Sequence, residues 1–274
     1  MPRCPECGTA VERIDAFCPE CGTALDDVEE ADAPAPAADE DGGRFDFDGD
    51  PFDADVFEFS FKYPLSNGLG TIGLAALLLL LSIFVIPYFM VLGYSARVGR
   101  AAAIGRRTPP ELTDWWELLG DGFKQFVAVG ALLLPVGAVY AALLFADQYV
   151  LAYVIYFPMI LAAAAINPVF YGTGSVRGVY SNLRFLRFIT TSNFWIGIAY
   201  QLGISILLYI VAFVLSIVLI LTIIGIPVAF ALLLVFPAYF LLLQAALWGR
   251  IYHDAAEADA VDPVERPADG TLTW

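Results

Sequence analysis

The sequence predicts an all-α fold: a polytopic membrane helix bundle with a small cysteine-containing module at its N-terminus. Three observations predict it. Hydrophobic residues make up 59% of the chain and the mean hydropathy is +0.71, whereas ordinary soluble domains are about 45–50% apolar. The apolar residues form uninterrupted stretches long enough to cross a bilayer, which takes about 20 residues per helix. All four cysteines lie within the first 21 residues.

The N-terminal module, residues 1–25, repeats one short motif. Cys4-Pro-Glu-Cys7-Gly-Thr-Ala recurs as Cys18-Pro-Glu-Cys21-Gly-Thr-Ala. Each Cys-X-X-Cys turn directs two sulfurs at one point, and four thiolates complete a tetrahedral zinc shell without an open position. The motif therefore predicts a structural zinc ribbon with Cys4, Cys7, Cys18 and Cys21 as ligands, in which zinc supplies the folding energy. Disulfides or a redox pair are the alternatives that this spacing disfavours.

Acidic segments flank the apolar middle of the chain. Residues 26–57 form an acidic linker and residues 251–274 an acidic tail, and both are expected to be disordered. At the end of the linker, four aromatic residues alternate with polar ones, which predicts an extended strip that docks on the membrane or on the helices. The four aromatic residues are Phe57, Phe59, Phe61 and Tyr63.

The membrane domain is expected over residues 58–250. Five segments are long and apolar enough to span a bilayer. The last two form one continuous apolar run, which is too long for a single crossing and is best broken at Gly225-Ile226-Pro227. The five segments are residues 70–94, 125–146, 149–171, 194–222 and 228–249.

The distribution of basic residues predicts the orientation. Arginine and lysine occupy the loops after the first and third segments and the end of the fifth, so these should face the cytoplasm. This alternation fits four spans, but a full crossing by the first segment would place the zinc ribbon outside, away from the reducing cytoplasm. We therefore expect a re-entrant hairpin, broken at Ile86-Pro87 into Gly70–Val85 and Tyr88–Val98, and a cytoplasmic N-terminus. A fifth span with an external N-terminus is the alternative.

Two loops carry candidate membrane-surface residues. Thr108 is a candidate cap for an amphipathic interfacial helix, in which Trp115 and Trp116 would anchor at headgroup level. The second loop presents a basic face at helical spacing, which predicts contacts with anionic lipid headgroups, although it could serve only to set the topology. Its residues are Arg177, Arg184 and Arg187.

The number and position of charged residues disfavour several classes of function. The net charge of −15 resides mostly in the two flanking segments, which makes nucleic acid an improbable partner and is typical of a halophile. The five segments contain no Asp, Glu, Lys, Arg or His, which disfavours proton relays and ion-coupled carriers. Prolines interrupt four of the five segments, and broken helices can mark transporter sites.

Several short stretches resemble a known family. They are Phe59-Ser-Phe-Lys-Tyr-Pro-Leu, Ile86-Pro87, Gly93-Tyr-Ser-Ala-Arg97-Val, Pro110-Glu-Leu-Thr-Asp114-Trp-Trp-Glu and Asp121-Gly-Phe-Lys124. Residues 58–250 resemble an archaeal family of uncharacterised multi-spanning membrane proteins, a domain of unknown function. Many haloarchaeal members look similar in also carrying an N-terminal zinc ribbon, which residues 4–21 resemble. The resemblance implies no activity and no functional residues.

The sequence therefore predicts four spans plus one re-entrant hairpin or fifth span, in a multi-pass protein of the cell membrane. We expect a non-enzymatic protein whose zinc ribbon binds a cytoplasmic protein partner, with the lipid bilayer as its surroundings. A facilitative transporter or pore subunit is the alternative. A homo-oligomer is compatible with either function.

Overall fold

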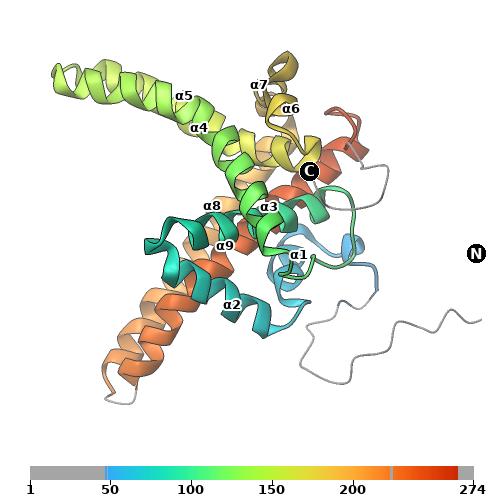
Figure 1. Cartoon of the computed structure of the whole chain (residues 1–274), viewed down its shortest axis with the longest axis vertical. Helices are drawn as coiled ribbons and strands as arrows, with labels where there is room; N and C mark the ends of the chain where they lie inside the picture. The colour runs from blue at the N-terminus through green and yellow to red at the C-terminus, as the bar shows by residue number, and fades with distance from the viewer. Residues whose placement is uncertain (1–46, 48, 223–224, 265–274) are drawn as a thin grey trace, which may run out of the picture. The chain divides into compact units, whose positions relative to one another are not determined.

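Figure 1 shows the computed structural model, which describes residue 47, residues 49–222 and residues 225–264. The chain divides into two units, Met1–Gly42 and Gly43–Trp274, and the fold below belongs to the second unit. The described residues form α-helices and short 3-10 helices and contain no β-strand. The predicted all-α class is therefore confirmed.

Four helices are long and apolar enough to cross a membrane, as predicted. They form two antiparallel pairs, α4 with α5 and α8 with α9, which diverge from each other in Figure 1. The turn between α8 and α9 lies at the expected glycine–proline break. The helices are α4 (Trp115–Phe145), α5 (Tyr149–Thr173), α8 (Ser192–Ile220) and α9 (Gly225–Glu257), with the short α6 (Val176–Tyr180) and α7 (Arg184–Ile189) between the pairs.

The first apolar segment forms a helical hairpin instead of one helix. It consists of α2 (Leu69–Leu80), a 3-10 turn and α3 (Val85–Ala103). The chain reverses at Phe84, whose backbone is extended (φ −94°, ψ 90°), and not at Ile86-Pro87 as expected. Pro87 lies in the first turn of α3, where a residue without an N–H donor leaves no helical hydrogen bond unmade.

Hydrogen bonds close this hairpin at its base. The Asn67 side-chain amide, just before α2, donates to the carbonyl oxygens of Pro109 and Pro110, just after α3, at 2.9 and 2.8 Å. The Tyr63 hydroxyl likewise donates to the carbonyl of Arg106 at 3.0 Å. Both ends of the hairpin therefore lie on the same side of the domain, while its tip exposes apolar residues such as Ile83, which is 84% exposed.

The aromatic strip that precedes α2 is helical, so the expected extended strip is wrong. Phe59 and Tyr63 stand one turn apart on α1 (Val56–Lys62) and its flank, are fully buried and stack with ring centroids 4.6 Å apart. Phe57 and Phe61 form a second pair at 4.7 Å. Aromatic residues at every second position also fit a helix, because residues i and i+4 lie on the same helical face. Phe57 and Phe61 therefore share one face and Phe59 and Tyr63 another, within two helical turns. Val56–Leu65 and Leu69–Ile83 form a helical pair bent by 80°, which together is long and apolar enough for a broken span or a re-entrant loop.

The interfacial helix expected to start at Thr108 does not form. Residues 104–114 connect α3 to α4 without a helix, and α4 begins at Trp115 after Asp114, which has a left-handed backbone (φ 57°). The physical reason is local. Thr108 and Pro109 each precede a proline, and a residue in that position is disfavoured from the helical region.

The prolines inside the long helices do not break them. α4 continues through Pro135, α5 through Pro158 and Pro168, and α9 through Pro237. Broken spans, on which the transporter alternative rested, are therefore absent from these four described helices.

Both flanking segments contribute to the fold beyond their expected boundaries. α9 continues past the predicted end of the membrane domain at residue 250 to Glu257, because Ile251, Tyr252 and Ala255 are buried. At the other end, the 3-10 turn Pro51–Asp53 packs within the supposed linker. Residues 1–46 and 265–274, which include the rest of the linker and tail, lie outside the described residues.

Candidate functional site

The predicted zinc ligands Cys4, Cys7, Cys18 and Cys21 lie outside the described residues. Their donor set fits zinc, since four thiolates in two Cys-X-X-Cys pairs are the ligands of a closed tetrahedral site. Within the part of the chain that the structure describes, no group of three His, Cys, Asp or Glu side chains is placed to hold a metal ion.

Basic residues at one end of the domain bind the segment that leads in from the N-terminus. The Arg250 guanidinium donates to the carbonyl of Phe52 at 2.7 Å and lies 4.8 Å from its ring centroid. Arg107 pairs with Asp50 at 2.9 Å. The backbone N–H of Phe52 donates to the Asp50 carboxylate, which with Arg107 lowers the pKa of that carboxyl. Residues 50–52 therefore lie against Arg107, which follows α3, and Arg250 on α9.

The three arginines predicted as one basic face lie on two helices. Arg177 is on α6, whereas Arg184 and Arg187 are on α7, because Asn182 and Leu183 take left-handed backbone conformations between them. Arg184 and Arg187 line a small cavity of about 130 Å³ together with residues of the C-terminal tail. The Arg184 Nε lies 2.9 Å from Asp262 Oδ2, so an acidic tail residue lies where a lipid headgroup was expected.

The two predicted interfacial tryptophans are the first two residues of α4. Trp115 is 42% exposed and Trp116 is 86% exposed. Their exposed rings at the first turn of a membrane-span candidate are compatible with an anchor at headgroup level. No contact in the described residues tests this role.

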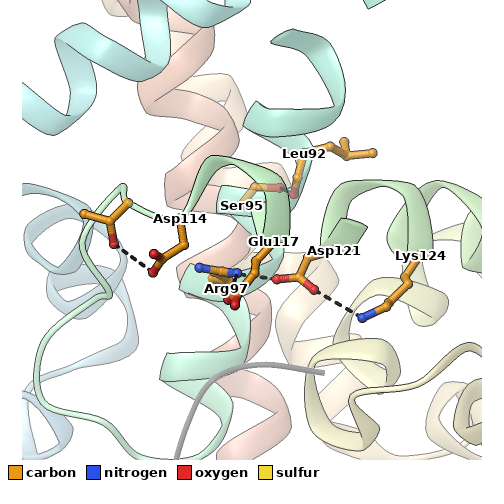
Figure 2. Close-up of polar contacts among 8 residues, drawn as sticks. Leu92, Ser95, Arg97, Asp114, Glu117, Asp121 and Lys124 are labelled. Atoms are coloured by element: carbon orange, nitrogen blue, oxygen red, sulfur yellow. Dashed lines mark hydrogen bonds and ion pairs between the residues drawn. The ribbon is translucent and has the colours of Figure 1, made fainter. Parts of the chain in front are cut away.

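A buried ion-pair network joins α3 to α4 next to these tryptophans. Figure 2 shows the Arg97 guanidinium between the carboxylates of Glu117 and Asp121, with Lys124 beyond Asp121. Arg97 Nε lies 2.8 Å from Asp121 Oδ2, and the two side chains are 6% and 4% exposed. Lys124 Nζ lies 3.4 Å from the other Asp121 oxygen.

The sequence did not predict this network, because its residues lie outside the predicted apolar segments. Arg97 follows the segment that ends at residue 94 and Asp121 precedes the segment that begins at residue 125, whereas α3 and α4 extend beyond those bounds. The signal that could have found the pair is one acidic and one basic residue at the facing ends of two apolar helices, where each requires a partner for burial.

A chamber of about 460 Å³ lies between α3, α4, α5, α8 and α9. Uncharged polar side chains from all five helices converge on it, and no charged residue lines it. The Gln125 amide donates to Asn167 Oδ1 at 3.2 Å, and the Trp248 indole donates to Gln201 Oε1 at 2.7 Å. The polar side chains that line the chamber are Tyr88, Ser95, Gln125, Asn167, Tyr171, Gln201, Gln244 and the Trp248 indole.

Two amides in this chamber have polar atoms without a partner. Gln125 Oε1 and both side-chain polar atoms of Gln244 are buried and make no hydrogen bond to any described residue. Gln125 is only 5% exposed. Such groups destabilise a fold by roughly 1–3 kcal/mol each unless something else satisfies them. Gln125 and Gln244 therefore supply polar atoms that lack a partner among the described residues at the wall of the chamber.

Residues 76–250 match a family described as a protein of unknown function, DUF4013, and this match covers more than half of the chain. The chain belongs to the DUF4013 family. Residues 3–25 match a zinc-ribbon domain, so the resemblance drawn from the sequence is confirmed for both parts. No curated protein and no solved structure matches the chain. All residues that line the chamber lie within the DUF4013 match, whereas α1 and residues 50–52 precede it.

Proposed function

We propose that this chain is a non-enzymatic, multi-pass protein of the cell membrane that holds a zinc-ribbon interaction module on the cytoplasmic side. The observation that carries the proposal is the closed base of the α2–α3 hairpin. Asn67 binds Pro109 and Pro110, so the chain enters and leaves the hairpin at one end of the domain. A hairpin of this kind, covered by α4 and α9, is a form that the membrane interior tolerates.

The charge distribution supports the cytoplasmic orientation. Arg107 and Arg250 bind residues 50–52, and Arg184 binds the tail. The opposite ends of the long helices carry a single charged residue, Asp147, in the described turns at 146–148 and 221–222. Since basic residues gather on the cytoplasmic side, the N-terminal module is expected there too, where its thiolates stay reduced.

The buried charges support a non-enzymatic role. Arg97 and Asp121 engage each other between two helices instead of facing the chamber. The chamber itself presents amides, hydroxyls and an indole, which are weak acids and bases. This arrangement favours binding and anchoring over acid–base or nucleophilic chemistry.

The proposed partner of the ribbon is a cytoplasmic protein. A linker as acidic as residues 26–46 repels nucleic acid, which favours a protein over a nucleic acid as the partner. The same acidity is in keeping with a cytoplasm of high salt. A homo-oligomer of the chain is compatible with this function.

Affinity purification from mild detergent tests this function. The full-length chain should retain a protein partner that is lost from the Cys4→Ser/Cys21→Ser variant, in which the ribbon cannot close its zinc shell. The matched control is Thr9→Ser/Thr23→Ser, which changes the same module without removing a ligand and should retain the partner. An identical set of bound proteins for all three chains would remove the basis of the proposal.

The chamber supports one second candidate, facilitative transport of an uncharged solute. Its 460 Å³ and neutral polar lining suit a small hydrogen-bonding molecule. Flux of uncharged polyols into liposomes that contain the purified chain tests it, with protein-free liposomes as the control. Equal flux in both would exclude that candidate for these solutes.

A further inference from the structure

We propose that the chamber between α3, α4, α5, α8 and α9 binds the hydroxyl-bearing headgroup of an uncharged amphiphile, such as a monoacylglycerol, that enters from the bilayer. The inference goes beyond the proposed interaction function and does not depend on the zinc ribbon. It rests on three properties of the chamber: its unsatisfied amides, its lack of charge and its exposed side.

The unsatisfied atoms define what the ligand must offer. Gln125 Oε1 and Gln244 Oε1 are acceptors, and Gln244 Nε2 is a donor. A hydroxyl group both donates and accepts, so two neighbouring hydroxyls satisfy this set better than a carbonyl or an amine alone. Several other polar groups of the chamber already have partners, since Trp248 donates to Gln201 Oε1 and Ser95 Oγ donates to the carbonyl of Leu92 at 2.8 Å.

The lining excludes a charged headgroup. No Lys, Arg, His, Asp or Glu lines the chamber. Arg97 and Asp121, on two of these helices, pair with each other, and Arg100 donates to the backbone carbonyl of Tyr171 at 3.0 Å. A phosphate or carboxylate in this place would lose its hydration without gaining a counter-ion, which is far more costly than burying a hydroxyl that is hydrogen-bonded. The ligand is therefore uncharged.

The exposed side of the chamber indicates where the ligand comes from. Tyr88 on α3 and Phe126 and Leu134 on α4 line the chamber and are 41%, 41% and 67% exposed, so the chamber opens to the surroundings of the domain at these residues. In a membrane-spanning domain those surroundings are acyl chains. A ligand with an apolar tail can thus place its headgroup at the two amides while its tail stays in lipid.

Native mass spectrometry of the full-length chain in detergent tests the proposal, with monoolein as the probe. Monoolein carries two neighbouring hydroxyls and no charge. We expect one monoolein retained per chain, in preference to methyl oleate, which lacks hydroxyls, and to oleate, which is charged. Gln125→Leu and Gln244→Leu should each weaken retention by up to about ten-fold, since each removes hydrogen bonds to the headgroup. Gln148→Leu, at an exposed turn outside the chamber, should leave retention unchanged.

Thermal unfolding separates binding from a structural role of the amides. Without ligand, Gln244→Leu should unfold at the same temperature as the unaltered chain or higher, because leucine replaces buried polar atoms that have no partner. Several results would overturn the proposal: retention of methyl oleate equal to that of monoolein, unchanged retention by both leucine variants, or displacement of monoolein by glycerol at equal concentration. The first would indicate an acyl-chain groove, the second trapped water at the amides, and the third a site for soluble polyols.

Discussion

The Arg97 guanidinium of α3 and the Asp121 carboxylate of α4 form a buried ion pair at 2.8 Å, with Glu117 as a second partner of the arginine at 3.3 Å. Removing one member leaves the other buried charge with only a partly exposed partner, Glu117 for Arg97 or Lys124 for Asp121, and breaking a buried pair typically costs about 3–5 kcal/mol. We therefore expect Arg97→Met and Asp121→Leu each to lower the free energy of unfolding in mixed micelles by about that amount.

The double variant Arg97→Met/Asp121→Leu provides the control for this prediction. Replacing both charges with apolar residues should restore most of the lost stability, because no buried charge remains. Additive losses in the double variant would show that the two side chains act independently and contradict the pairing.

Two glycines allow the closest approach of α3 to α4. A Cβ atom on Gly122 would lie 1.8 Å from the carbonyl oxygen of Phe89, and one on Gly93 would lie 1.9 Å from that of Leu118. Gly122→Ala should therefore push the helices apart and lower the unfolding free energy by about 1–3 kcal/mol, the usual range for overpacking. The same mixed-micelle unfolding measures it.

Gly120→Ala is the matched control for this substitution. Gly120 lies on the same helix with nothing within 4 Å of its added Cβ, so alanine should stabilise α4 by about 0.5–1 kcal/mol through its better helix propensity. Equal effects of the two substitutions would contradict the close crossing of α3 and α4.

The sequence predicts features that depend on one stretch of the chain better than features that depend on packing between helices. Segment length and hydropathy are properties of each stretch alone, so the four spans and the break before Pro227 could be predicted. The prolines do not mark breaks in the helices, because Pro87 lies in the first turn of α3 and Pro135 lies inside α4. The aromatic alternation from Phe57 to Tyr63 fitted two periodicities, and only burial against α9 decides between them.

The polar sites show the same limit more clearly. Gln201 and Gln244 could be noted as polar residues within apolar segments, but their convergence with Gln125 depends on how five helices pack. Arg97 and Asp121 are 24 residues apart in sequence, and nothing local indicates that they meet. The zinc ligands are the opposite case, because their spacing alone carries the chemistry.

The zinc ribbon makes a prediction about thiols. The purified chain should contain one zinc per molecule, and denaturation without reductant should expose four free thiols, because four thiolates bind the metal and none is oxidised. Metal analysis and thiol titration measure both. Cys18→Ser should lose most of the metal, whereas Thr23→Ser should keep it. Two or fewer free thiols in the metal-free chain would indicate disulfides instead.

The C-terminal tail is predicted to compete with anionic lipid. The Asp262 carboxylate forms an ion pair with Arg184, with Oδ2 at 2.9 Å from Nε, in the cavity that Arg187 also lines. Asp262→Asn should strengthen binding of phosphatidylglycerol about five-fold, since one basic residue near an anionic surface contributes about 1 kcal/mol. Asp147→Asn, which makes the same change of charge at the opposite end of the helices, should have no effect. Thermal shifts with phosphatidylglycerol and phosphatidylcholine provide the measurement, and equal responses of both variants would exclude the competition.

The most direct test of the account is the side of the membrane on which the two ends of the α2–α3 hairpin lie. Single cysteines at Glu58, Arg107, Asp147 and Thr222, in a chain whose native cysteines are serines, can be labelled with a membrane-impermeant maleimide in right-side-out and inverted vesicles. All four positions are exposed or partly exposed. We predict that Glu58 and Arg107 label only from the cytoplasmic side, and Asp147 and Thr222 only from outside. Labelling of Glu58 and Arg107 from opposite sides would show that residues 69–103 cross the membrane and would contradict the re-entrant hairpin.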